Sequence, residues 1–136
     1  MAWQTTFNGN WKTALTTALT TATVKLGPVS NVEADPNTSA TIICSTQRQF
    51  RPEQSPTSTR TYDVELFLGV VMQGMDDADS VDDLWDTLDT VEDAAWTILL
   101  PGTFRATNKI DAVVSIAAQP LTARTGTVRV TLRVRR

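Results

Sequence analysis

The stretch Thr127–Arg135 reads TVRVTLRVR, in which apolar and polar side chains alternate without exception. Successive side chains of a β-strand point to opposite faces, so strict alternation predicts a strand with one buried face. The inward set is Val128, Val130, Leu132 and Val134. The outward set is Thr127, Arg129, Thr131, Arg133 and Arg135. The pattern therefore predicts a sheet with a core on one face and solvent on the other.

Three other stretches, rich in β-branched or aromatic residues, also predict strands: Thr41–Phe50, Thr61–Gln73 and Asp111–Gln119. One face of the second would hold Tyr62, Val64, Leu66, Leu68, Val70 and Met72. Asp63 and Glu65 would lie on its opposite face. In the third, the residues in phase are Ala112, Val114, Ile116 and Ala118.

Two stretches have the period of about 3.6 residues that is typical of an amphipathic helix. The first is Asn10–Thr23, with Asn8 or Asn10 as its N-cap. Its apolar face would hold Trp11, Leu15, Ala18, Leu19 and Ala22. The second runs from about Val81 to Leu99. Its apolar arc consists of Val81, Leu84, Leu88, Val91, Ala95 and Leu99.

The order helix, hairpin, helix, hairpin predicts an α+β fold, namely a mainly antiparallel four-stranded sheet with two helices packed on one face. With 136 residues and 41% hydrophobic composition, the chain fits a single domain over residues 1–136. The segment RPEQSPTSTR, residues 51–60, has two prolines and no apolar residue. It is expected to be the exposed tip of the first hairpin, and either a partner-binding loop or a plain connector. The partner-binding candidates are Arg51, Glu53, Gln54 and Arg60.

Charge and composition exclude several classes of protein function. The net charge of −3 lacks the basic excess of an autonomous nucleic-acid-binding protein. Because the chain has no histidine, imidazole-activated nucleophiles and the usual Cys/His zinc sites are excluded. The single cysteine, Cys44, lies in the apolar run TIIC and is expected to be a buried structural residue. No signal peptide or transmembrane stretch is recognisable, so we expect a soluble, non-secreted protein.

The segment Met75–Trp96, MDDADSVDDLWDTLDTVEDAAW, holds nine of the fifteen acidic residues. On a helical wheel Asp86, Asp89 and Asp93 fall within about 40° of Asp82, opposite the apolar arc. We call these four residues the acidic stripe. An EF-hand loop is excluded because the segment lacks the required glycine and final glutamate. The stripe is therefore expected to face water or another molecule, with a weak cation site as the alternative.

Five of the twelve basic residues gather at the end of the chain: Arg124, Arg129, Arg133, Arg135 and Arg136. Arg129, Arg133 and Arg135 would project from an edge strand, where they would hinder edge-to-edge aggregation. The alternative is a head-to-tail contact, in which this basic strand of one subunit faces the acidic stripe of the next. Such a contact would relieve the repulsion between stripe residues four apart, which is about a few tenths of a kcal/mol per pair.

The chain combines an N-terminal amphipathic helix, a hairpin whose second strand reads RTYDVELFLGVV, the helix DSVDDLWDTLDTVEDAAW and a closing hairpin that ends in VRVTLRVRR. In this order and character of elements it resembles the tail terminator proteins of long-tailed (siphovirus-type) bacteriophages. The chain departs from that family in its many threonines and in Trp3 and Phe7, which precede the first predicted helix.

The resemblance implies a non-enzymatic virion protein, without cofactor or metal, that is assembled in the host cytoplasm into a hexameric ring. The implied partners are further copies of the chain, the tail tube protein and the head–tail connector. DNA would pass through the lumen of the ring without specific binding. The acidic stripe would then face either the lumen, where it would repel DNA, or a neighbouring subunit.

Three other interpretations remain open. The chain could be another phage neck, connector or tail-tube protein, since these share small α+β architectures. It could be a metal-dependent enzyme or a ligand-binding domain that uses the Asp-rich helix. It could also be an adaptor domain that recognises a partner through residues 51–60.

Overall fold

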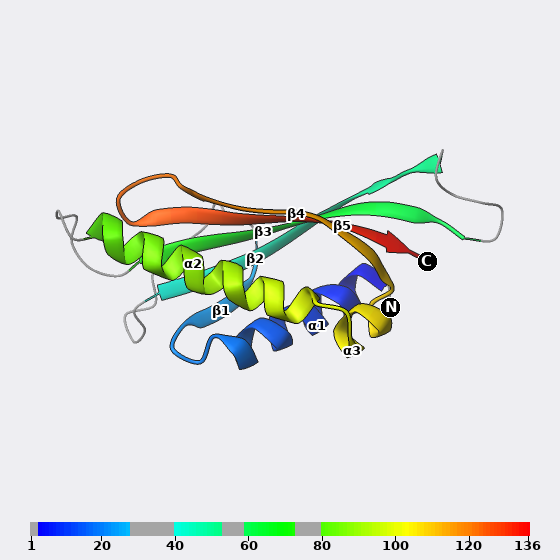
Figure 1. Ribbon diagram of the computed structural model, residues 1–136, viewed down its shortest axis with the longest axis horizontal. Coiled ribbons are helices and arrows are strands. Elements are labelled where there is room, and N and C mark those ends of the chain that lie inside the picture. Colours follow the sequence, from blue (N-terminus) through cyan, green and yellow to red (C-terminus); the bar gives the residue numbers. More distant parts are fainter. Residues whose placement is uncertain (1–2, 28–39, 53–58, 73–79) are drawn as a thin grey trace.

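The computed structural model describes residues 3–27, 40–52, 59–72 and 80–136. In chain order the elements are α1 (Trp3–Ala18), β1 (Thr23–Leu26), β2 (Ala40–Phe50), β3 (Thr61–Met72), α2 (Ser80–Leu99), α3 (Thr103–Thr107), β4 (Ile110–Pro120) and β5 (Thr125–Arg135). The five strands form one sheet in the order β1-β2-β3-β5-β4. Helices α1 and α2 lie on one face of it, in a second layer (Figure 1). The predicted α+β class is thereby confirmed.

The sheet has one strand more than the sequence pattern predicts, and it is mixed. β1 pairs parallel with β2, opposite Thr41–Cys44, whereas the other strand pairs are antiparallel. The prediction of a four-stranded sheet is therefore wrong in strand number, although all four predicted strands are present. The strand was missed because β1 is only four residues long, TVKL, which is too short for an alternating pattern.

Helix α1 begins earlier than predicted and ends at Ala18 instead of Thr23. Its buried residues are Phe7, Trp11 and Leu15, so the aromatic residues ahead of the predicted helix belong to it. Asn8 and Asn10 lie inside the helix and are not its N-caps. Their side chains bond to other elements, because Asn8 Oδ1 accepts from Thr46 at 2.7 Å and Asn10 Nδ2 donates to Asn108 at 2.9 Å. Tertiary contacts thus extend a helix that its threonine-rich sequence favours only weakly.

Helix α2 confirms the predicted apolar arc at every position whose burial is described. Leu84, Leu88, Val91, Ala95 and Leu99 are all buried. The connector after α2 contains the short helix α3, so the described chain has three helices instead of the predicted two. The sequence TFRAT of α3 is only five residues long and carries no helical period of its own.

Strand β5 has the predicted faces, with Val128, Val130, Leu132 and Val134 each 0% exposed. Strand β4 keeps the predicted phase at Ile116 and Ala118, which pack against the core, but not at Val114. Its register against β5 shifts between Ile110 and Ala112 and again between Val113 and Ser115. A β-bulge adds an unpaired residue and exchanges the faces of the residues that follow, and the second bulge restores the earlier phase. Val114 is therefore 55% exposed, and Val113 packs against the core in its place.

The sheet has one face covered by the helices and one face without a helix in the part of the chain that the structure describes (Figure 1). The face without a described helix, here called the open face, carries the alternate residues of β3 and β5, such as Asp63, Glu65 and Arg129. This confirms the predicted placement of Asp63 and Glu65 opposite the apolar face of their strand. The fold therefore presents two different polar surfaces, one on α2 and one on the open face.

Candidate functional site

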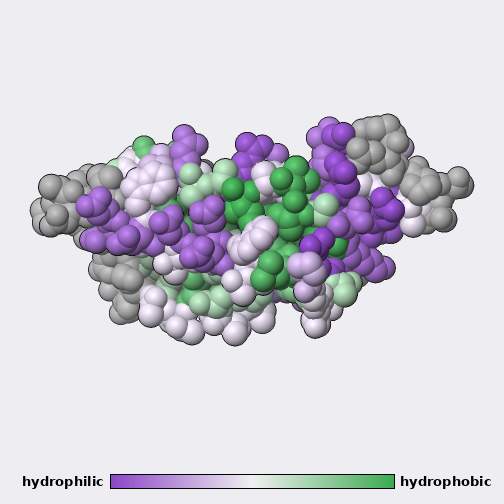
Figure 2. Space-filling view, viewed as in Figure 1, coloured by the Kyte–Doolittle hydropathy of each residue, from purple (hydrophilic) through white to green (hydrophobic). Residues whose placement is uncertain are grey.

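The acidic stripe lies on the solvent side of α2. Asp82, Asp86, Asp89 and Asp93 are all exposed, and the buried leucines of α2 hold the opposite side of the helix against the sheet. None of the four carboxylates forms an ion pair with a described residue. Figure 2 shows hydrophilic atoms along the first part of α2, where the stripe begins.

The arginines of β5 lie on an interior strand. β5 pairs with β3 along one side and with β4 along the other, so the prediction of an edge strand is wrong. Alternation alone cannot distinguish an edge strand from an interior strand, because both have one buried and one open face. The described edges of the sheet are β1 and β4.

Each of the three predicted interface arginines has a carboxylate partner within the chain. Arg129 Nη2 lies 2.5 Å from Glu65 Oε1, and its guanidinium also lies 5.6 Å from the centre of the Phe67 ring. Arg133 Nε lies 3.8 Å from Asp63 Oδ1. Arg135 Nη2 lies 3.5 Å from Asp111 Oδ2. Carboxylates of the same chain thus neutralise part of the positive charge of β5.

The hairpin of β2 and β3 carries the candidate partner-binding loop. Arg51 Nη1 bonds to Asp63 Oδ2 at 3.1 Å, so this side chain is held on the open face. Arg60 is exposed, and its backbone exchanges two hydrogen bonds with Arg136, both at 2.7 Å. Glu53 and Gln54 lie outside the described residues. Among the loop candidates that the structure describes, Arg60 is therefore the residue whose charged side chain is exposed to solvent.

An aromatic cluster lies at the loop end of this hairpin, where Phe50 pairs with Tyr62. Tyr62 of β3 packs against Trp3 of α1 and Phe50 of β2, with ring centres 5.3 and 5.5 Å apart. The Arg48 guanidinium lies 5.0 Å from the Trp3 ring centre and 5.4 Å from that of Tyr62. Cation–π contacts of this kind hold long strands together where the two-layer core ends.

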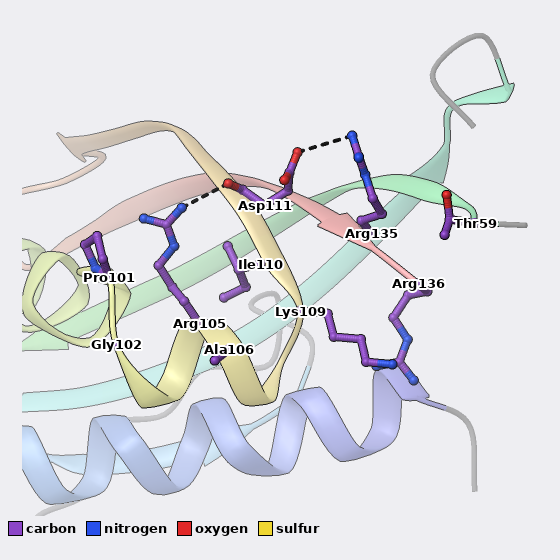
Figure 3. Close-up of a pocket in the computed structure, with 10 residues that line it drawn as sticks. All are labelled: Thr59, Pro101, Gly102, Arg105, Ala106, Lys109, Ile110, Asp111, Arg135 and Arg136. Atoms are coloured by element: carbon purple, nitrogen blue, oxygen red, sulfur yellow. Dashed lines mark hydrogen bonds and ion pairs between the residues drawn. The ribbon is translucent and has the colours of Figure 1, made fainter. Parts of the chain in front are cut away.

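A basic concavity that the sequence did not predict lies where α3, β4 and the end of β5 meet. Its volume is about 660 Å³, and Figure 3 shows the side chains that line it. Four of them are cationic: Arg105, Lys109, Arg135 and Arg136. We call these four the basic notch. They come from two stretches far apart in the sequence, residues 105–109 and 135–136, so no sequence window contains all four. Of these two stretches, the C-terminal arginines are the part that the sequence pattern indicates.

Exposed apolar side chains, here called the apolar strip, lie near the end of α2 and on β4. Trp96 is 55% exposed, Leu100 is 43% exposed, and Val114 of β4 is 55% exposed. Figure 2 shows hydrophobic atoms gathered near the second half of α2. Exposed apolar surface bordered by polar residues is typical of a surface that contacts another protein.

Cys44 is the single cysteine of the chain. Cys44 is buried in β2, and burial raises the pKa of its thiol from 9.0 to about 12 against a smaller opposing effect of Lys12. The thiol is therefore protonated at neutral pH and does not act as a nucleophile. Over residues 3–27, 40–52, 59–72 and 80–136, no three Cys, Asp or Glu side chains lie close enough to hold a metal ion. No described helix is long and apolar enough to cross a membrane.

Comparison with known proteins adds no assignment, since no protein-family model and no curated protein matches the chain.

Proposed function

We propose that this protein is the tail terminator of a long-tailed bacteriophage. In this role it is a structural, non-enzymatic virion protein. Copies of it form a ring, with six subunits as in the family it resembles, which caps the tail tube and joins it to the head–tail connector. The ring is assembled in the host cytoplasm and lets DNA pass through its lumen without specific binding.

The observation that carries the proposal is the long hairpin of β2 and β3. At one end it extends past the layer formed by α1 and α2 (Figure 1). β2 and β3 pair along their whole length, from Ala40 opposite Met72 to Phe50 opposite Tyr62. A paired arm that is held by the aromatic cluster and ends in an exposed cation, Arg60, is suited to contact a partner, and a protein that joins two other structures needs such contacts.

The helix layer supports the same proposal. The exposed acidic stripe and the exposed apolar strip give α2 and β4 surfaces suited to neighbouring copies. Any stripe residues that face the lumen repel phosphate groups, so DNA slides through without adhering.

The test is to mix the purified protein with isolated tail tubes and to examine the mixture by negative-stain electron microscopy. A terminator forms rings, binds one end of each tube and stops further addition of tube subunits. Incorporation along the tube indicates a tube protein instead, and binding to heads but not to tubes indicates a connector.

A metal- or ligand-binding role for the Asp-rich helix is tested separately by calorimetry with Mg²⁺ and Ca²⁺. Carboxylates spaced along one solvated helix face bind divalent cations only weakly. Tight stoichiometric binding would therefore indicate a dedicated cation site and support that alternative.

A further inference from the structure

The basic notch carries more positive charge than the chain itself neutralises. Its four cations face one acidic side chain of the lining, Asp111, which already pairs with Arg135 at 3.5 Å. The Lys109 ammonium and the Arg136 guanidinium form no ion pair with a described residue. Arg136 instead lies over the Trp3 ring, with its guanidinium carbon 5.3 Å from the ring centre. An open concavity with this charge favours an anionic occupant.

The backbone that carries these cations is held in place by hydrogen bonds. Asn108 is buried, and its amide donates to the Phe104 carbonyl at 2.9 Å, which closes the end of α3. Arg135 N–H donates to the Lys109 carbonyl at 3.0 Å, joining the turn to β5. Arg105 reaches across the notch, where Nη2 donates to the Asp111 carbonyl at 3.0 Å (Figure 3). Because the cations sit on fixed segments, an anionic partner would need little rearrangement to bind them.

The acidic stripe of the same chain is an anionic surface whose charge is opposite to that of the basic notch. The four aspartates of the acidic stripe recur at intervals of three and four residues, and so extend over about 16 Å of helix surface. Their mutual repulsion is relieved only by counter-ions or by a cationic partner.

The stripe and the notch are separate surfaces of one copy. The stripe ends at Asp93, six residues before the end of α2 at Leu99, and the notch begins beyond that end, at Pro101. At a rise of about 1.5 Å per residue, Asp93 lies about 9 Å and Asp82 about 26 Å along the axis from Leu99. None of the four stripe carboxylates forms an ion pair with a described notch cation. The two surfaces therefore complement each other between copies, not within one.

We propose that the basic notch of one copy binds the acidic stripe of a second copy, which gives a head-to-tail contact between subunits. Such a contact uses two different surfaces of each subunit and therefore repeats from copy to copy, closing a ring where the rotation allows. The proposal rests on the ring-forming role proposed above and assigns the surfaces that would build the ring.

The test uses two charge-reversed variants of the full chain. The notch variant carries Lys109→Glu and Arg136→Glu, and the stripe variant carries Asp86→Lys and Asp89→Lys. Sedimentation velocity over a range of concentrations measures self-association at low salt. For each variant alone, we expect the dissociation constant of self-association to be at least about tenfold higher than that of the unmodified chain. Circular dichroism and thermal melting verify that both variants are folded.

Mixing the two variants is the decisive step. In the mixture, the carboxylates that the notch variant carries at positions 109 and 136 can pair with the ammonium groups that the stripe variant carries at positions 86 and 89. The unmodified notch of the stripe variant can in turn bind the unmodified stripe of the notch variant, so each variant can bind the other. A one-to-one mixture should recover assembly, with the two variants in equal amounts. The assembly of the unmodified chain should also weaken when ionic strength rises, because the Debye length falls from about 10 Å at 0.1 M to about 3 Å at 1 M.

Matched controls change the same number of charges elsewhere. Lys12→Glu with Lys25→Glu controls for the notch variant, and Asp83→Lys with Glu92→Lys controls for the stripe variant on the same helix. Both controls should associate as the unmodified chain does.

The proposed contact is overturned if the unmodified chain is monomeric at all concentrations, if the variants associate like their controls, or if mixing does not restore assembly. The terminator role is measured independently, by binding of the unmodified chain to tube ends. Association through the apolar strip, for example, would overturn the contact and leave the terminator role standing.

Discussion

Gly126 of β5 lies directly beneath Leu88 of α2. A Cβ at position 126 would stand 3.0 Å from Leu88 Cδ2 and 3.1 Å from Cδ1, closer than real Cβ atoms ordinarily approach a neighbour. It would also stand 3.0 Å from the Gln119 carbonyl oxygen of β4. The missing side chain lets α2 rest closely on the sheet.

Replacement of Gly126 by alanine tests this close approach. The carbonyl of Gln119 belongs to a paired strand and cannot move freely, so Gly126→Ala should lower the free energy of unfolding by about 1–3 kcal/mol. Urea unfolding followed by circular dichroism measures the change.

Gly9 provides the matched control. It lies in α1, where a Cβ would meet no atom within 4 Å. Gly9→Ala should raise the free energy of unfolding by up to about 1 kcal/mol, because alanine favours a helix more than glycine does. If both substitutions change the free energy of unfolding in the same direction, the contact between α2 and β5 is not as close as described.

The sequence predicted those parts of the fold in which one long segment carries its own periodic pattern. The alternation of β5 and the apolar arc of α2 both identified their buried faces, because burial on one side imposes a period on the sequence. The pattern could not show which strands are neighbours, so β5 was placed at an edge. It also could not show β1 or α3, since neither is long enough to complete a period.

The pKa of Cys44 predicts how stability changes in alkaline solution. Burial raises this pKa from 9.0 to about 12, so the folded chain keeps the thiol proton over a range in which the unfolded chain loses it. The stabilisation from the protonated thiol is therefore complete below pH 9 and is lost as the pH rises toward 12. In that range the free energy of unfolding should fall by up to about 1.4 kcal/mol per pH unit from this group.

Cys44→Ala isolates the contribution of Cys44 from that of other groups that titrate at high pH. The variant is less stable overall because it leaves space in the core, but its stability should fall less steeply between pH 9 and 11. Equal slopes for the variant and the unmodified chain would contradict the raised pKa. In addition, iodoacetamide should modify Cys44 only when the chain is unfolded.

The pair Arg129–Glu65 should contribute little to stability despite its short distance of 2.5 Å. The Arg129 side chain is 54% exposed, so water and salt screen the interaction. A double-mutant cycle with Arg129→Met and Glu65→Gln should give a coupling energy of about 0.2–1 kcal/mol. This energy should decrease further in 1 M salt, and a larger, salt-insensitive value would show that the open face is buried against a partner.

The charged surfaces show why a site built from distant segments resists prediction. The acidic stripe was recognisable because its four residues share one helix. The basic notch joins Arg105 and Lys109 to the end of β5, and only the pairing of β4 with β5 brings them together. The arginines of β5 looked available for a partner because the sequence does not show that Asp63, Glu65 and Asp111 lie beside them.

Arg60 offers a test of the hairpin as the arm that contacts the tail tube. Its side chain is exposed, and only its backbone pairs with Arg136, so Arg60→Glu should change the free energy of unfolding by no more than about 0.5 kcal/mol. The proposed role predicts that this variant still forms rings but binds tube ends more weakly, by about tenfold or more, because a charge at the contact is reversed. Counting capped tubes in negative-stain micrographs at a series of protein concentrations measures the loss.

Lys25→Glu makes the same charge change on β1 and should cap tubes as the unmodified chain does. Equal capping by the two variants would show that Arg60 does not contact the tube, whereas loss of rings in Arg60→Glu would place the hairpin at a subunit interface.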